Sequence, residues 1–123
     1  IIRRDTKICD KYDETLLRER CRLHIAEHYN DIELCQKLTY KNFKNSCLSE
    51  VASQLHDSQY CNLMTDSVEL PTKGGCYSNI AFQYQDVKMC DIIKDQKEKK
   101  YCVKIIEDRI KLMQEIESGQ YQK

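Results

Sequence analysis

Apolar positions recur along the chain in a pattern that is repeated four times. In each copy an apolar or aromatic residue stands directly before a cysteine and another stands three residues after it, so both lie on one face of a helix. A second cysteine follows, and apolar residues four and eight positions beyond it form a second helical stripe. The residues of this second stripe are Ile25, Val51, Ile80 and Ile106 at the nearer position and Tyr29, Leu55, Tyr84 and Ile110 at the farther one. The pattern predicts a short helix and a longer helix in every copy.

An aspartate stands four residues before the first cysteine of every copy, at Asp5, Asp31, Asp57 and Asp86, with spacings of 26, 26 and 29 residues. Such periods are typical of repeat arrays. Because a carboxylate accepts hydrogen bonds from the free amides of a first helical turn, we expect each aspartate to be a helix N-cap. The chain is therefore predicted to be one all-α domain, 1–123, of four helical hairpins stacked as a short solenoid-like array. Its units are about 5–30, 31–56, 57–85 and 86–118.

The expected first helices are 5–12, 31–38, 57–64 and 86–93, and the expected second helices are about 13–29, 41–55, 75–84 and 97–117. Unit 3 contains three extra residues, and its stretch 65–75 holds the only proline and two of the three glycines, so we expect a loop there. Insertions of this kind often project from the binding face of a repeat protein, although a tolerated surface insertion is the simpler alternative.

The last second helix continues beyond the repeat. Ile106, Ile110, Met113 and Ile116 lie along one side of it until Ser118 and Gly119 end it. We expect this side to cover the open end of the stack as a terminal cap.

Eight cysteines in regular pairs indicate four disulfides, because the chain has no CxxC and no spacing typical of zinc or iron-sulfur ligands. Eight buried free thiols are the alternative. Disulfides indicate an oxidising compartment or, less often, the cytosol of a hyperthermophile.

Positions along the hairpin favour disulfides within units. Cys35 lies about one turn before its connection and Cys47 about two turns after the next helix begins, so the two sulfurs reach similar heights, whereas Cys47 and Cys61 match less well. The preferred bonds are Cys9 to Cys21, Cys35 to Cys47, Cys61 to Cys76 and Cys90 to Cys102.

The charges balance, with 20 Lys and Arg against 20 Asp and Glu. This balance argues against nucleic acid as the main partner. No apolar run approaches the roughly 18 residues that a membrane span needs. No signal peptide is recognised and the first residue is not Met, so we interpret the chain as a processed mature protein or an excised part of a larger one.

One stretch has the residue order of a metalloenzyme motif. His24, Glu27 and His28 spell HxxEH, the order of an inverted zinc-protease site. In the repeat register, however, both histidines occupy mostly solvent-side positions, so we expect an ordinary surface helix, with no metal, no cofactor and no catalytic residue.

Four tyrosines fall outside the apolar stripes: Tyr40, Tyr77, Tyr101 and Tyr121. Because tyrosine anchors many protein interfaces, they are candidate contact residues, together with Pro71 and Lys73 of the insertion.

The unit, D-x-x-apolar-C-x-x-apolar followed by C-x-x-x-[IV]-A, resembles cysteine-paired helical-hairpin repeats of uncharacterised secreted proteins and lipoproteins from archaea and bacteria. The resemblance covers Asp5 to about Ile110; Glu107 replaces the alanine in the last unit, and the length of unit 3 departs from the family's spacing. It implies a secreted or cell-surface location, and it implies no activity or substrate.

The function that we expect is a non-catalytic extracellular structural or interaction module that binds a protein partner or copies of itself, including assembly into a filament. A carrier of small apolar ligands with a tyrosine-lined groove is the alternative. A metalloenzyme that uses His24, Glu27 and His28 is the third hypothesis.

Overall fold

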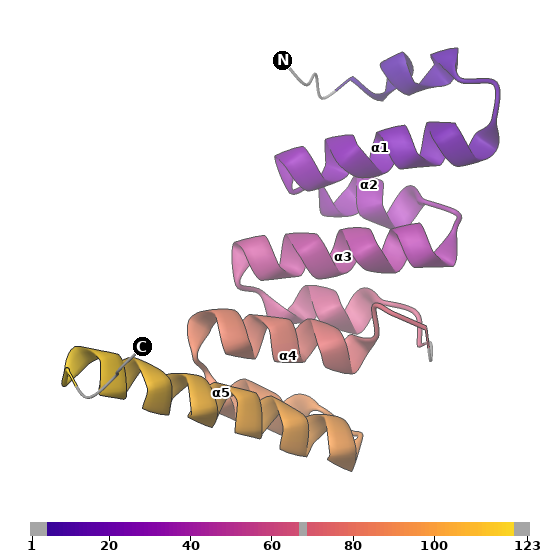
Figure 1. Ribbon diagram of the computed structural model, residues 1–123. Helices are drawn as coiled ribbons and strands as arrows, with labels where there is room; N and C mark the ends of the chain where they lie inside the picture. Colours follow the sequence, from indigo (N-terminus) through magenta and orange to yellow (C-terminus); the bar gives the residue numbers. More distant parts are fainter. Residues whose placement is uncertain (1–4, 67–68, 120–123) are drawn as a thin grey trace.

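The computed structural model describes residues 5–66 and 69–119, and helices are the only regular elements in these ranges (Figure 1). Each unit contains one short helix and one long helix. In chain order the elements are η1 (Thr6–Lys11), α1 (Thr15–Tyr29), α2 (Ile32–Lys37), α3 (Lys41–Leu55), η2 (Ser58–Leu63), α4 (Lys73–Tyr84), η3 (Val87–Ile92) and α5 (Gln96–Glu117). The chain is therefore all-α, as predicted. Within the described ranges, no helix is both long and apolar enough to cross a membrane.

The long helices agree with the expected bounds to within two residues, whereas the short helices differ in kind. Each short helix has six residues rather than eight, and η1, η2 and η3 are 3-10 helices. The residue three positions after the first cysteine ends each of them in extended backbone. In units 2 to 4 that residue, Leu38, Met64 or Ile93, is buried in the core. So short a segment favours the tighter 3-10 winding because it makes few hydrogen bonds of either type.

The repeated aspartates join one unit to the next. The residues before them, Asn30, His56 and Gln85, have left-handed backbones with φ between 52° and 54°. This turn lets the amide of the following aspartate donate back to the carbonyl of the alanine five residues earlier, at 2.9 Å for Asp31, 3.0 Å for Asp57 and 2.8 Å for Asp86. These bonds close the preceding long helix in the manner of a Schellman motif.

Three of the four aspartates are also N-caps through their side chains. The carboxylates of Asp5, Asp31 and Asp57 accept from the amides of Lys7 at 2.9 Å, Leu34 at 3.1 Å and Gln59 at 3.0 Å. Asp86 occupies the N-cap position of η3, but its side chain makes no capping hydrogen bond, so this prediction was wrong for the side chain.

The four disulfides have the predicted within-unit pairing, with Cα to Cα distances of 5.4 to 5.8 Å, and the described chain has no free cysteine. The residues four positions after the second cysteine are buried, as are the alanines that follow in units 1 to 3. The position eight residues after it was wrong as a core position for Leu55 and Tyr84, which are exposed, whereas Ile110 packs against the core. Leu55 and Tyr84 are the last residues of their helices before the left-handed turn, and Tyr84 stacks on His56 of the preceding unit.

The hairpins lie in a row, and each packs only on its neighbours. α1 contacts α3, α3 contacts α4 and α4 contacts α5, and each of these long helices except α5 also contacts the short helix of the following unit. The long helices point the same way, so the connections that lead into them lie along one edge of the row, at the right in Figure 1. One continuous core of buried residues runs through units 1 to 4.

The C-terminal end of the row is not covered by an apolar face. Ile106 is buried, but Met113 and Ile116 are 40% and 47% exposed, because α5 continues past the end of α4 (Figure 1). The predicted terminal cap is therefore wrong for these residues, although α5 does end at Ser118 and Gly119. The outer positions of α5 are charged instead: Glu107 stands where Ala26, Ala52 and Ala81 are buried in the other units.

Substitution of a repeated aspartate should lower the free energy of unfolding more where its side chain makes a capping hydrogen bond than where it makes none. We expect Asp57→Ala to lower the free energy of unfolding by about 1 kcal/mol, because the Gln59 amide loses its acceptor. Asp86→Ala is the matched control and should cost less, since its side chain makes no such bond. Urea unfolding with the disulfides intact measures both, and equal losses would contradict the assignment.

Candidate interaction groove

At two of the three junctions, a buried polar side chain of one unit binds the connection of the next unit; we call this contact the clasp. At the third junction it is replaced by another arrangement. In the first clasp, Glu19 of α1 is buried, and its Oε1 accepts from the Thr39 amide at 2.6 Å, the Thr39 hydroxyl at 3.0 Å and the Tyr40 amide at 3.1 Å. Arg22 lies 3.7 Å from Oε2 of the same carboxylate. Because Tyr40 precedes α3, Glu19 fixes where that helix begins.

The second clasp repeats this geometry with a neutral residue. Asn45 of α3 is buried; its amide nitrogen donates to the Thr65 carbonyl at 3.0 Å, and its oxygen accepts from the Thr65 amide at 2.9 Å. Glu19 and Asn45 both stand two residues before the second cysteine, and Thr39 and Thr65 both stand four residues after the first cysteine of the following unit. The clasp is therefore part of the repeat.

In the third pair of units the clasp residue is Gly74, which has no side chain to reach Lys94 of unit 4. The vacated space holds the carboxylate of Glu98 from α5: a Cβ added at Gly74 would lie 1.6 Å from Glu98 Oε2. The connection between units 3 and 4 therefore has no clasp of this kind, and a groove passes it.

This groove has a volume of about 1280 Å³ and follows the edge formed by the connections. Its lining comes from all four units: Leu16 of α1, residues 40–43 at the start of α3, Asn62, Asp66 and Glu69, residues 72–74 and Tyr77 of α4, and residues 92–95 and Glu98. The groove is open to solvent along the row rather than enclosed. Three of the six predicted contact residues, Tyr40, Lys73 and Tyr77, meet in it.

The other predicted contact residues do not line the groove. Pro71 is half-buried in the inserted loop, after a cis peptide bond with Leu70. Tyr101 is 64% exposed on α5. Tyr121 lies outside the described residues.

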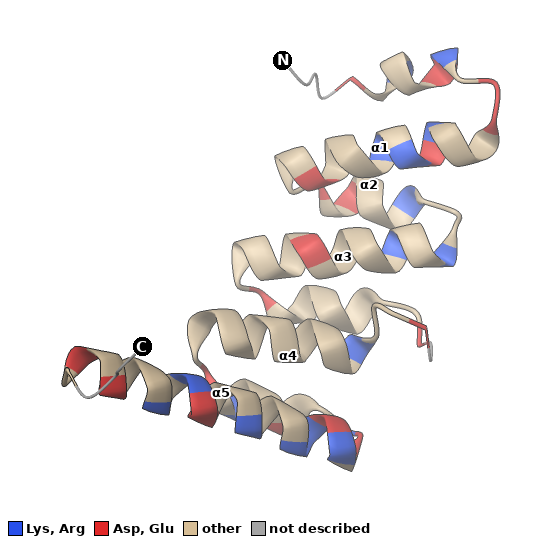
Figure 2. Ribbon diagram, viewed as in Figure 1, with Lys and Arg blue, Asp and Glu red and all other residues tan. Residues whose placement is uncertain are grey.

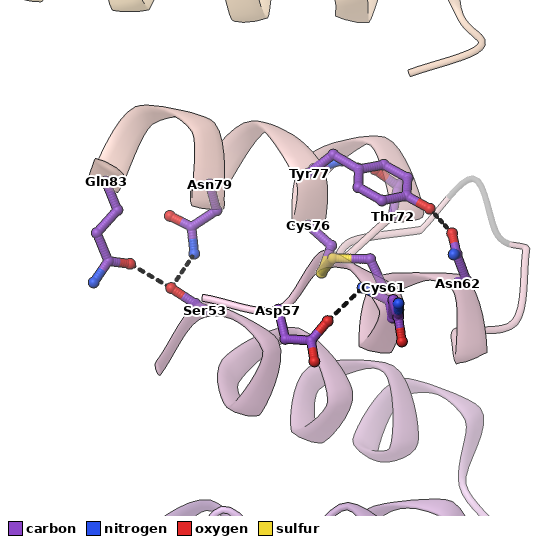
Figure 3. Close-up of a disulfide and its surroundings, with 11 residues drawn as sticks. Ser53, Asp57, Cys61, Asn62, Thr72, Cys76, Tyr77, Asn79 and Gln83 are labelled. Atoms are coloured by element: carbon purple, nitrogen blue, oxygen red, sulfur yellow. Dashed lines mark hydrogen bonds between the residues drawn. A yellow bond between two sulfur atoms is a disulfide. The ribbon is translucent and has the colours of Figure 1, made fainter. Parts of the chain in front are cut away.

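Tyr77 is a wall of the groove rather than an exposed contact. It is only 6% exposed, and its hydroxyl donates to Oδ1 of Asn62 (Figure 3). Burial raises the pKa of this phenol above its ordinary value. The expectation of a free contact residue was therefore wrong, because α4 turns this position toward η2 of its own unit.

The chemical character of the groove is mixed. Leu16, Tyr40 and Ile92 offer exposed apolar surface, while the charged lining residues include three lysines and four carboxylates: Lys41, Lys73, Lys94, Asp66, Glu69, Asp95 and Glu98. Lys73 and Asp66 pair across the inserted loop at 3.4 Å. Figure 2 shows basic residues on the first turns of α3 and residues of both signs at the start of α5. Such a surface suits a ligand with both apolar side chains and charges.

The HxxEH stretch lies on α1, away from the groove, with His24 and His28 exposed. Within 5–66 and 69–119, no three His, Cys, Asp or Glu side chains gather in a geometry that holds a metal ion. The pKa of Glu27 is raised, first by burial and then by the nearby Glu50 carboxylate, while His24 lowers it in part.

Residue-by-residue reasoning missed the clasp residues Glu19, Asn45 and Gly74. Their signal was present in the repeat register, since a buried glutamate, a buried asparagine and a glycine occupy the same place in three units. The polar clasp could have been found by comparing that place across the copies.

Comparisons with known proteins returned no matching family model, no matching curated protein and no matching solved structure.

The first clasp can be tested by changing its carboxylate. We expect Glu19→Ala to lower the free energy of unfolding by about 2 kcal/mol, because the partly buried amides of Thr39 and Tyr40 lose a charged acceptor. Glu19→Gln is the control: it keeps one oxygen for these donors and should cost clearly less. Urea unfolding measures both, and equal losses would show that the Oε1 contacts do not hold the connection.

The raised pKa of Glu27 predicts that the difference in stability between Glu27→Gln and the parent depends on pH. Because its pKa is raised in the folded state, the free energy of unfolding falls as pH rises through that pKa. Glu27→Gln should therefore be more stable than the parent at pH 7 by about 0.5 kcal/mol, since this half-exposed site screens the repulsion. The difference should vanish at pH 3, where the glutamate is protonated in both states. Unfolding curves at the two pH values test this, and a stabilisation that persists at pH 3 would assign the effect to packing.

Proposed function

We propose that the protein is a non-catalytic interaction module outside the cytoplasm, and that the groove along its connection edge binds an extended segment of a protein partner. One observation carries the proposal: an open groove of about 1280 Å³ crosses the row of units and is lined by exposed apolar side chains and by charges of both signs. A peptide presents both kinds of group at short intervals, so it matches such a lining along its length.

The frame around the groove suits this role. Each connection lies between two cysteines joined by a disulfide, and two of the three inter-unit contacts are clasped by buried polar side chains. A preorganised surface loses little conformational entropy on binding, which favours affinity. The four disulfides also support a secreted or cell-surface location, since such bonds persist in oxidising compartments.

A carrier of small apolar ligands is the second candidate, supported by the exposed rings and aliphatic chains at Leu16, Tyr40 and Ile92. Sites for apolar ligands are usually enclosed and mostly apolar. The open groove and its many charges favour the peptide over this alternative.

The proposal can be tested by selecting binders from a random peptide library displayed on phage and measuring their affinities by calorimetry. We expect Tyr40→Ala to weaken the selected peptides roughly tenfold, since an exposed tyrosine at the centre of a binding surface is a frequent hot spot. Tyr101→Ala is the matched control, because Tyr101 is exposed but lies outside the groove, and it should have no effect.

Two outcomes would reject the proposal. One is a selection that yields no peptide, and the other is a set of peptides that bind Tyr40→Ala as tightly as they bind Tyr101→Ala. Titration with a long-chain fatty acid tests the carrier hypothesis. That hypothesis requires saturable binding of the fatty acid together with a library selection that yields no peptide.

A further inference from the structure

The contacts between successive units follow a fixed register at two places. In the first, which we call the clasp rule, the residue two before the second cysteine contacts the residue four after the next unit's first cysteine, as in the Glu19–Thr39 and Asn45–Thr65 clasps. In the second, which we call the second rule, the residue six after the second cysteine contacts the residues three and seven after the next unit's second cysteine.

The second rule is followed by direct side-chain contacts at the last two junctions of the described chain. Ser53 accepts from Asn79 at 3.5 Å and donates to Gln83 (Figure 3). In the next junction the Arg109 guanidinium lies 4.5 Å from the centre of the Phe82 ring. In the first, Glu50 acts on the ionisation of Glu27.

The same register can be carried past unit 4 onto unit 1 of another molecule. The clasp rule then pairs Lys100 with Asp13, and the second rule pairs Asp108 with His24 and His28. All five side chains are exposed in the single molecule. Lysine opposite aspartate is complementary in charge, and aspartate opposite two histidines pairs an acceptor with N–H donors, which an arbitrary pair of surfaces need not do.

The outer face of unit 1 is also incompletely covered. Ile8, directly before the first cysteine, is 48% exposed, whereas its counterparts Leu34, Tyr60 and Met89 are partly buried and pack on the core. Cys21 is half-buried, whereas Cys47 and the other second cysteines are fully buried. In units 2 to 4 these positions are covered by the unit before. A neighbour docked on unit 1 in the same way would cover Ile8 and Cys21.

We propose that a second copy of this chain docks end-on, with the outer face of α5 in unit 4 placed against unit 1 in the register of the internal junctions. The contact is heterologous and leaves a free end on each partner, so association continues into an open row of copies. This surface lies apart from the groove, and the proposal does not depend on peptide binding.

Glu107 sets the strength of this contact. It stands where the alanines of the other units are fully buried, so its carboxylate would face the interior of the end-on junction and limits how closely the two faces approach. The end-on contact is therefore weaker than an internal junction, and association is reversible and depends on concentration.

Sedimentation velocity from 10 µM to 1 mM protein at low ionic strength tests the proposal, with about 0.1 M added salt expected to weaken association by screening. We expect Lys100→Glu and Asp13→Lys, each alone, to weaken association roughly tenfold by placing like charges opposite each other. The double variant Lys100→Glu/Asp13→Lys restores an opposite pair and should recover association. Glu107→Ala should tighten association roughly tenfold.

Lys41→Glu is the control for the change in charge, because Lys41 lies in the groove of unit 2, away from both ends. It should associate as the parent does, and circular dichroism checks that every variant is folded. A parent chain that stays monomeric up to 1 mM would overturn the proposal. So would association that the single end variants leave unchanged or that the double variant fails to restore. Loss of association with Lys41→Glu would place the contact in the groove instead.

Discussion

The disulfide within each hairpin is the constraint on which the rest of the structure depends. Each short helix has six residues, far below the length at which an isolated helix persists in water. The bond to the long helix holds it in place over a loop of 12 residues, or 15 in unit 3, and contributes about 3 kcal/mol in the chain-entropy account. With the short helix in place, the residue that ends it, such as Leu38 or Met64, enters the core shared by neighbouring units.

Covalent bonds act within units, and polar contacts act between them. The aspartate at each of the three boundaries closes one helix with its amide, and Asp31 and Asp57 also cap the next short helix with their carboxylates. Glu19 and Asn45 then fix where the following connection lies. These buried polar residues hold a junction in one register, because any slip would leave their partners without hydrogen bonds.

The groove and the ends of the row are places where the repeat is altered. Gly74 removes a clasp, and the inserted loop of unit 3 brings Asp66 and Lys73 to the same edge, so the widest departure from the repeat coincides with the candidate binding surface. At the C-terminal end, Glu107 replaces a buried alanine and the outer positions of α5 are charged. This outer face is polar, so it tolerates water and supports only the weak, reversible contact that we propose with a second copy.

The helical class, the four repeat units, the long-helix bounds and the preference for disulfides within units follow from the sequence, because each depends on local spacing: the periodicity of apolar residues, the positions of the cysteines and the residues that end helices. The N-caps at Asp5, Asp31 and Asp57 follow in the same way. Which stripe positions are buried depends on the tertiary packing. Leu55 and Tyr84 remain exposed at the ends of their helices, and Met113 and Ile116 lie where α5 continues past α4. This packing also brought Tyr40, Lys73 and Tyr77 together, because a groove between units depends on how hairpins pack, and that packing is set by contacts about 20 residues apart such as Glu19 to Thr39.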